Sequence, residues 1–171
     1  MTLVRVFVLF IVLSFASQVQ AEDFTSRQIG PYTTLSFETG QSALTSYSKE
    51  LLRNVVRKAS DIGKIEEIQT AVWSDNPAPN GSEELAKADI TLAEKRVNSI
   101  KNYISHTLKV SDVSTYNMAE RANWLARTFN TDQAQLKSEI GRDTYMSKEQ
   151  FQIFKDHGQA SRAVVLVILK K

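Results

Sequence analysis

The stretch AVVLVIL, residues Ala163–Leu169, decides how this chain is expected to fold. It is continuously apolar and rich in β-branched side chains, which is typical of a strand buried on both faces of a sheet. Such a strand needs other strands beside it and helices above it. The rest of the chain should therefore supply both kinds of element.

Upstream segments have the patterns of those neighbouring elements. Residues 29–37 alternate polar and apolar side chains, and residues 65–75 and 110–116 are shorter strand candidates. Apolar side chains at helical spacing predict one helix over residues 45–60 and a second over residues 83–106. The expected fold class is an α/β two-layer sandwich in the order β-α-β-α-β, then a helical insert, then the last strand.

The second helix matters most for function. Ser82 is its expected N-cap, because a serine side chain can accept a hydrogen bond from the first turn. Its expected buried stripe comprises Leu85, Ala88, Leu92, Ala93, Val97, Ile100 and Ile104.

The helical insert is expected at about residues 119–157. Thr131 can cap a helix over residues 132–140, and Ser147 to Gln150 form a capping box for a later one. Residues 22–34 are expected to be an N-terminal segment, and residues 35–171 the domain that contains this insert.

Residues 1–21 have the features of a signal peptide. Val6–Ala16 is apolar, and Val19-Gln20-Ala21 has the small residues that a signal peptidase accepts. The apolar run, at about 16 Å as a helix, is too short to cross a bilayer of about 30 Å. An uncleaved N-terminal anchor is the alternative. We expect export to the periplasm, no lipid anchor because the chain has no cysteine, and no transmembrane segment after cleavage.

The composition excludes several kinds of chemistry. The 171 residues include no cysteine and only His106 and His157, so thiolate zinc sites and cysteine nucleophiles are absent. Neither histidine lies beside a recognisable nucleophile motif. A net charge of +2 with dispersed Lys and Arg does not indicate nucleic-acid binding. We therefore expect no enzyme activity, no cofactor and no nucleic-acid partner.

Four segments together resemble the OmpA-like domain, a peptidoglycan-binding module of Gram-negative envelope proteins. They are Phe37–Leu44 before the first helix, Val72–Asp75 after the second strand, Asp89–Val97 in the second helix, and Ser161–Val164 at the last strand. Trp73, Asp89 and Ala163 stand where the family has His, Asn and a second Arg.

This resemblance implies a site for the diaminopimelate of the peptidoglycan stem peptide. Asp75 would accept hydrogen bonds from the ligand's ammonium, and Arg96 would clamp its carboxylate with a planar fork. Asp89 lies seven residues before Arg96 and could orient it. Ser74 could add a hydroxyl, and Arg162 corresponds to an arginine that often belongs to the family's binding region.

Each of these residues also has a structural interpretation. Arg96 could be a solvated or Glu-paired helix residue, and Asp75 could simply shape the turn before Asn76-Pro77. Arg162 could form a structural ion pair. Trp73 is expected to pack under the extra loop, the lengthened segment between Asp75 and Arg96, and a stacking surface for glycan or peptide is the alternative.

The expected function is thus a non-catalytic, outer-membrane-associated module that binds the peptidoglycan stem peptide from the periplasm. The alternative is an OmpA-like protein–protein interaction module that has lost wall binding. In that case an envelope protein would bind through the helical insert.

Overall fold

The protein is a mixed α/β domain with one four-stranded sheet. The computed structural model describes residues 27–76, 85–120 and 147–171. Its elements are β1 (Arg27–Ser36), α1 (Ser46–Ile62), β2 (Ile65–Val72), α2 (Lys87–Asn102), η2 (Tyr103–Thr107), β3 (Val113–Asn117), α4 (Lys148–His157) and β4 (Arg162–Lys170). The strand order is β1-β4-β2-β3. β4 is antiparallel to β1 and β2, whereas β2 and β3 are parallel. The expected fold class is confirmed.

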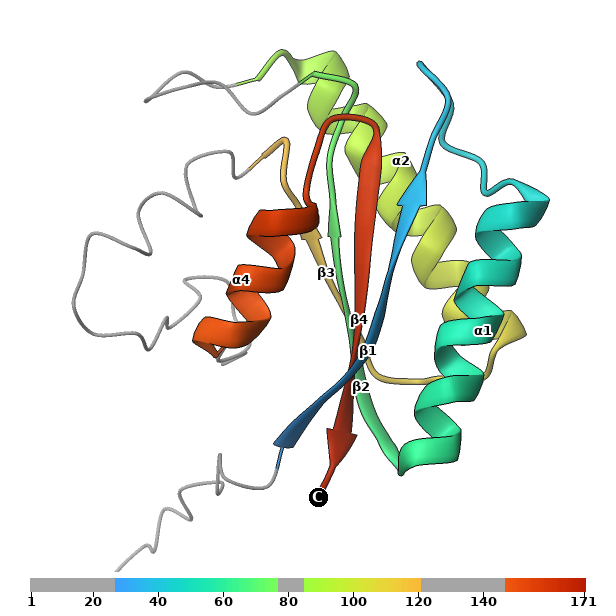
Figure 1. The fold of residues 1–171 in the computed structure, drawn as a ribbon. Helices are drawn as coiled ribbons and strands as arrows, with labels where there is room; N and C mark the ends of the chain where they lie inside the picture. Colours follow the sequence, from blue (N-terminus) through green and yellow to red (C-terminus); the bar gives the residue numbers. More distant parts are fainter. Residues whose placement is uncertain (1–26, 77–84, 121–146) are drawn as a thin grey trace, which may run out of the picture.

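The last strand occupies the centre of the sheet, as its sequence predicts. Residues 163–169 of β4 are each no more than 1% exposed. β1 and β2 pair with its two edges, and helices cover both faces of the sheet, α1 and α2 on one side and α4 on the other (Figure 1). An uninterrupted apolar run is stable in this position because neither face contacts water.

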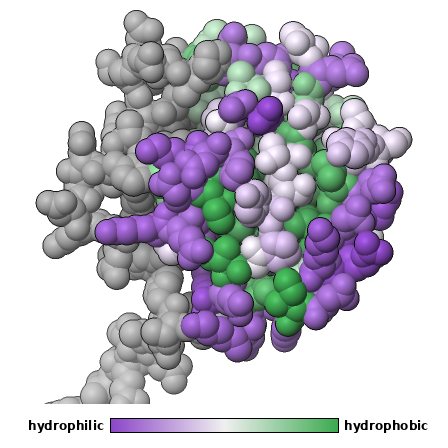
Figure 2. All heavy atoms as spheres, in the orientation of Figure 1, coloured by the Kyte–Doolittle hydropathy of each residue, from purple (hydrophilic) through white to green (hydrophobic). Residues whose placement is uncertain are grey.

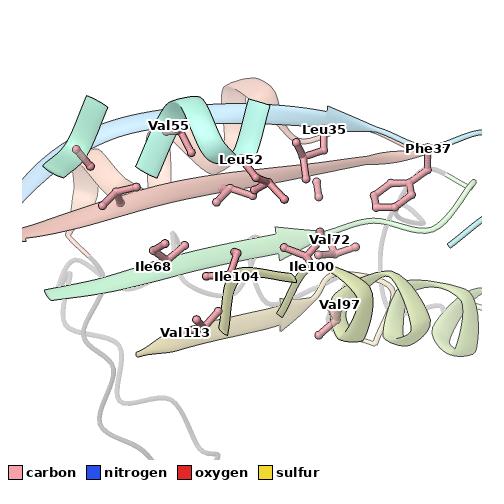
Figure 3. Packing of buried hydrophobic residues seen from close by; sticks show 14 of the residues in the cluster. Leu35, Phe37, Leu52, Val55, Ile68, Val72, Val97, Ile100, Ile104 and Val113 are labelled. Carbon is pink, nitrogen blue, oxygen red and sulfur yellow. The ribbon is translucent and has the colours of Figure 1, made fainter. Parts of the chain in front are cut away.

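The larger core lies between the sheet and the helices α1 and α2 (Figure 3). Apolar side chains at helical spacing predicted this helix, and three of them, Leu52, Val55 and Ala59, are buried in α1. Thr45 caps this helix by accepting a hydrogen bond from the Ser48 N–H. These residues pack against sheet residues such as Leu35, so α1 is held by its apolar face.

A second core lies on the opposite face, beneath α4. Phe151 and Phe154 of α4 pack against Trp73, Leu166 and neighbouring apolar residues of the sheet. The predicted capping box at the start of α4 is present, with Ser147 and Gln150 bonded reciprocally. The two-layer description therefore holds for the sheet with α1 and α2, and α4 adds a cover on the other side. The helix expected over residues 132–140 lies outside the described residues.

β1 is an edge strand between the two helical layers. In the view of Figure 2, hydrophilic residues lie over α1 and α4, and paler and apolar residues lie between them, where β1 runs. Pro31 lacks an N–H group, and the pairing with β4 shifts between Ile29 and Tyr32. Both features make an edge less able to pair with another strand. Residues 27–34, expected in an N-terminal segment, belong to this strand.

α2 differs from its predicted pattern near its start. The structure begins the helix at Lys87 with Ala86 as N-cap, and Ser82 lies outside the described residues. Ala88, expected to be buried, is exposed, whereas Asp89 and Arg96 are buried. The helix presents this polar flank to the loop after β1 and to the end of β2, and these cover it.

The signal peptide expected over residues 1–21 lies outside the described residues. Within residues 27–76, 85–120 and 147–171, no helix has the length and apolar character that spanning a membrane requires.

Candidate functional site

Arg96 is at the centre of the predicted site, and its side chain is 0% exposed. Nε donates to the Gln41 carbonyl oxygen at 2.8 Å, and Nη1 donates to the Trp73 carbonyl oxygen at 3.0 Å. Nη2 donates to the Glu38 carbonyl oxygen at 3.2 Å and to Asp75 Oδ1 at 2.5 Å. The guanidinium therefore joins α2 to the loop after β1 and to the end of β2.

An aromatic ring completes the enclosure of this guanidinium. The Phe37 ring lies beneath it, with the Arg96 Cζ atom 4.7 Å from the ring centroid. A cation over an aromatic face is favourable by about 0.5–2 kcal/mol, more when water is excluded. The resemblance implies that Arg96 clamps a ligand carboxylate, which requires an accessible guanidinium, but the Arg96 side chain is 0% exposed. The loop after β1 covers it, because two of that loop's carbonyl groups are hydrogen-bonded to Arg96.

Asp75 is the anionic partner, and it lies three residues beyond the end of β2. Its Oδ1 atom accepts hydrogen bonds from Arg96 and from the Ser161 hydroxyl at 2.7 Å. Its Oδ2 atom accepts from the Gly40 N–H at 2.5 Å. The Asp75 side chain keeps 17% of its surface exposed. One carboxylate thus ties three segments together and still reaches solvent.

The surroundings of Asp75 favour its charged form. Burial alone would raise the pKa of Asp75, but the hydrogen bonds from Gly40, Ser161 and Arg96 and the positive charge of Arg96 outweigh it and lower the pKa below its ordinary value. Asp75 is consequently a fixed anion at neutral pH.

Ser161 also belongs to this site, although no functional role was expected for it from the sequence. It has a φ of 59°, in the left-handed region that residues other than glycine seldom adopt. Its N–H donates to the Ser74 carbonyl at 2.6 Å, and its carbonyl accepts from the Phe37 N–H at 2.9 Å. These bonds hold the strained turn and direct the Ser161 hydroxyl toward Asp75. Its position in the segment Ser161–Val164, one of the four that resemble the family, could have indicated a role at the site.

Asp89 does not orient Arg96, which corrects the expectation for this residue. Both of its carboxylate oxygens accept from Asn76 Nδ2, at 3.0 and 3.1 Å. The Ser74 hydroxyl is also engaged with Asn76, whose backbone N–H and carbonyl lie 3.3 Å from Ser74 Oγ. Asp89 and Ser74 therefore fix the chain that follows β2 rather than the guanidinium.

Arg162 and Trp73 have structural positions next to the site. Arg162 begins β4, and its carbonyl accepts a hydrogen bond from the Trp73 N–H at 2.9 Å. No described residue forms an ion pair with the Arg162 side chain. Trp73 is only 6% exposed and packs beside Gly158 at the end of α4. Trp73 therefore packs under α4. Most of the loop after Asp75, under which it was expected to pack, lies outside the described residues.

No protein-family model matches the chain. No curated protein matches it either. Among solved structures it is similar to the OmpA-like domain of FopA1 from Francisella tularensis subsp. tularensis SCHU S4, at 15% sequence identity and a TM-score of 0.45. That match covers 81% of this chain and 72% of the other.

Proposed function

We propose that the protein is a non-catalytic OmpA-like binding module that acts in the periplasm and recognises the diaminopimelate of the peptidoglycan stem peptide. One observation carries the proposal. The two charged residues that match the family's motifs, Asp75 and Arg96, are 21 positions apart in the chain and form a direct ion pair. If the resemblance were due to chance, these two side chains would not be expected to contact each other.

The chemistry of the pair suits an ammonium group better than a carboxylate. Asp75 is held by three donors, is ionised at neutral pH and is partly exposed. A ligand ammonium could therefore add a charge-assisted hydrogen bond to a carboxylate that is already in place. Arg96 uses its donors inside the protein, and its role in this proposal is to position Asp75.

A binding assay on purified cell wall tests the proposal. Sacculi that contain diaminopimelate should pull down the wild type, and the Asp75→Asn variant should bind about ten- to a hundredfold more weakly, since one charge-assisted bond contributes about 1.5–3 kcal/mol. Asp61→Asn is the matched control, because Asp61 is exposed on α1 near the start of β2, away from the site. Thermal melting of each variant separates lost binding from lost folding. Undiminished binding by folded Asp75→Asn would refute the site.

A protein–protein interaction module is the second candidate, and the enclosure of Arg96 favours it. The family's clamp on a ligand carboxylate needs an accessible guanidinium, and the Arg96 side chain is 0% exposed. This candidate predicts that wild-type protein fails to bind sacculi and that a defined envelope protein remains bound after wall digestion. The α4 surface, within the predicted insert, is where the partner would bind. Binding of wild-type protein to purified, protein-free sacculi would exclude it.

A further inference from the structure

A groove lies between α2 and the loop after β1, the same loop whose carbonyl groups are bonded to Arg96. Its volume is about 520 Å³. Gly40 and Ser42 of the loop after β1 form one wall, and the α2 residues Lys87, Thr91 and Lys95 belong to the other. The described residues that line the groove do not include Asp75 or Arg96.

The α2 wall is basic. Lys87, Thr91 and Lys95 are four residues apart in turn, so they lie along one face of the helix. Both lysines are exposed, and neither forms an ion pair with a residue that the structure describes. The described lining of the groove contains no carboxylate. Two exposed ammonium groups that pair with no described carboxylate thus flank an open groove, with the Thr91 hydroxyl between them and the Ser42 hydroxyl opposite.

The loop after β1 joins this groove to the candidate site. The Gly40 N–H donates to Asp75 Oδ2, and Gly40 also lines the groove. The carbonyl groups of Glu38 and Gln41, on either side of Gly40, accept hydrogen bonds from Arg96. The buried pair therefore fixes the wall of the groove. Gly40 is thus the residue through which Asp75 and the groove are connected.

We infer that Lys87 and Lys95, in place of the enclosed Arg96, bind the carboxylates of the stem peptide. The inference rests on the proposed function, because it takes the same ligand. It assigns the ligand's two kinds of charge to different parts of the surface: ammonium at Asp75, carboxylates at the lysines. Recognition of the carboxylates by two exposed ammonium groups should be sensitive to salt.

A soluble stem peptide ending in diaminopimelate, with its carboxylates free or amidated, is the probe, and calorimetry measures its affinity. The double variant Lys87→Gln/Lys95→Gln should bind the free-acid peptide about tenfold more weakly than wild type. The double variant Lys87→Arg/Lys95→Arg, which keeps both charges, should restore most of the affinity. Lys58→Gln/Lys64→Gln removes the same charge from exposed positions near the opposite end of the sheet and should bind like wild type.

The amidated peptide supplies the decisive comparison. It should bind wild type as weakly as the free-acid peptide binds Lys87→Gln/Lys95→Gln, and the substitution should cost no further affinity. Wild-type affinity in Lys87→Gln/Lys95→Gln, with binding lost in Asp75→Asn, would overturn this inference and leave the proposed function standing. A wild-type protein that binds neither the peptide nor sacculi would overturn both.

Discussion

Arg96 is a buried cation, and no other side chain could make all of its hydrogen bonds. Its guanidinium is bonded to three backbone carbonyls and to Asp75. Arg96→Met would keep the length of the side chain but leave those acceptors without the donor they have in the wild type. Removing one partner of a buried ion pair costs about 3–5 kcal/mol, so the free energy of unfolding should fall by that amount in urea denaturation. Lys101→Met, an exposed change on the same helix, should alter it by less than about 0.5 kcal/mol.

Asp75 should make the protein sensitive to acid. Its pKa in the folded protein lies below its ordinary value, which is about 3.9 in an unfolded chain. Its stabilising contribution is therefore complete above the unfolded pKa and is lost as the pH falls through the folded one. Asp75→Asn, which cannot titrate, should lose less unfolding free energy than wild type between neutral pH and about pH 3. Urea denaturation at a series of pH values measures this, and parallel curves for the two proteins would contradict it.

The helices and strands that could be predicted are those with a hydrophobic or capping pattern within their own residues. The β4 run, the α1 stripe and the α4 capping box each depend on residues close together in the chain, and each was predicted. The burial of the Arg96 side chain was not predicted. The spacing of apolar residues describes one face of α2 and contains no information about the loop that covers Arg96. Asp75 and Arg96 could be paired through the order of the motifs. The partners of this pair that contribute backbone atoms could not be predicted, because every residue has such atoms. These partners include Glu38, Gly40 and Gln41.

The end of α4 depends on the absence of a side chain at Gly158. A Cβ atom there would lie 2.1 Å from Trp73 Cζ2 and 2.6 Å from the Phe154 carbonyl oxygen. Gly158→Ala should therefore force α4 away from the sheet and lower the free energy of unfolding by about 1–3 kcal/mol. Gly63→Ala is the control, because Gly63 has an extended backbone and no atom within 4 Å of a new Cβ. It should be neutral or stabilising by up to about 1 kcal/mol in the same denaturation assay. Equal effects of the two changes would contradict close packing at Trp73.

At the scale of the whole molecule, the two cores lie on opposite faces of the sheet, and β4 at its centre contributes alternate side chains to both. Val165 and Val167 of β4 point into the core under α1 and α2, whereas Leu166 and Ile168 point into the core under α4. β4 also pairs along both of its edges, but no described strand pairs with the outer edge of β1. Loss of either helical layer would thus expose apolar side chains of the same strand. This arrangement makes β4 the element whose amides are protected only while the entire domain is folded.

Hydrogen exchange followed by NMR should therefore resolve a gradient across the sheet. The β4 amides should exchange most slowly, because they open only on global unfolding, whereas alternate β1 amides point away from β4 and should exchange fast. Gly158→Ala supplies the sharper test. If β4 opens only globally, the protection of its amides should fall in that variant by the same free energy that urea denaturation measures, although the substitution lies on the α4 side. Protection of β4 that does not change in the variant would mean that the strand opens locally, and the two cores would then be independent.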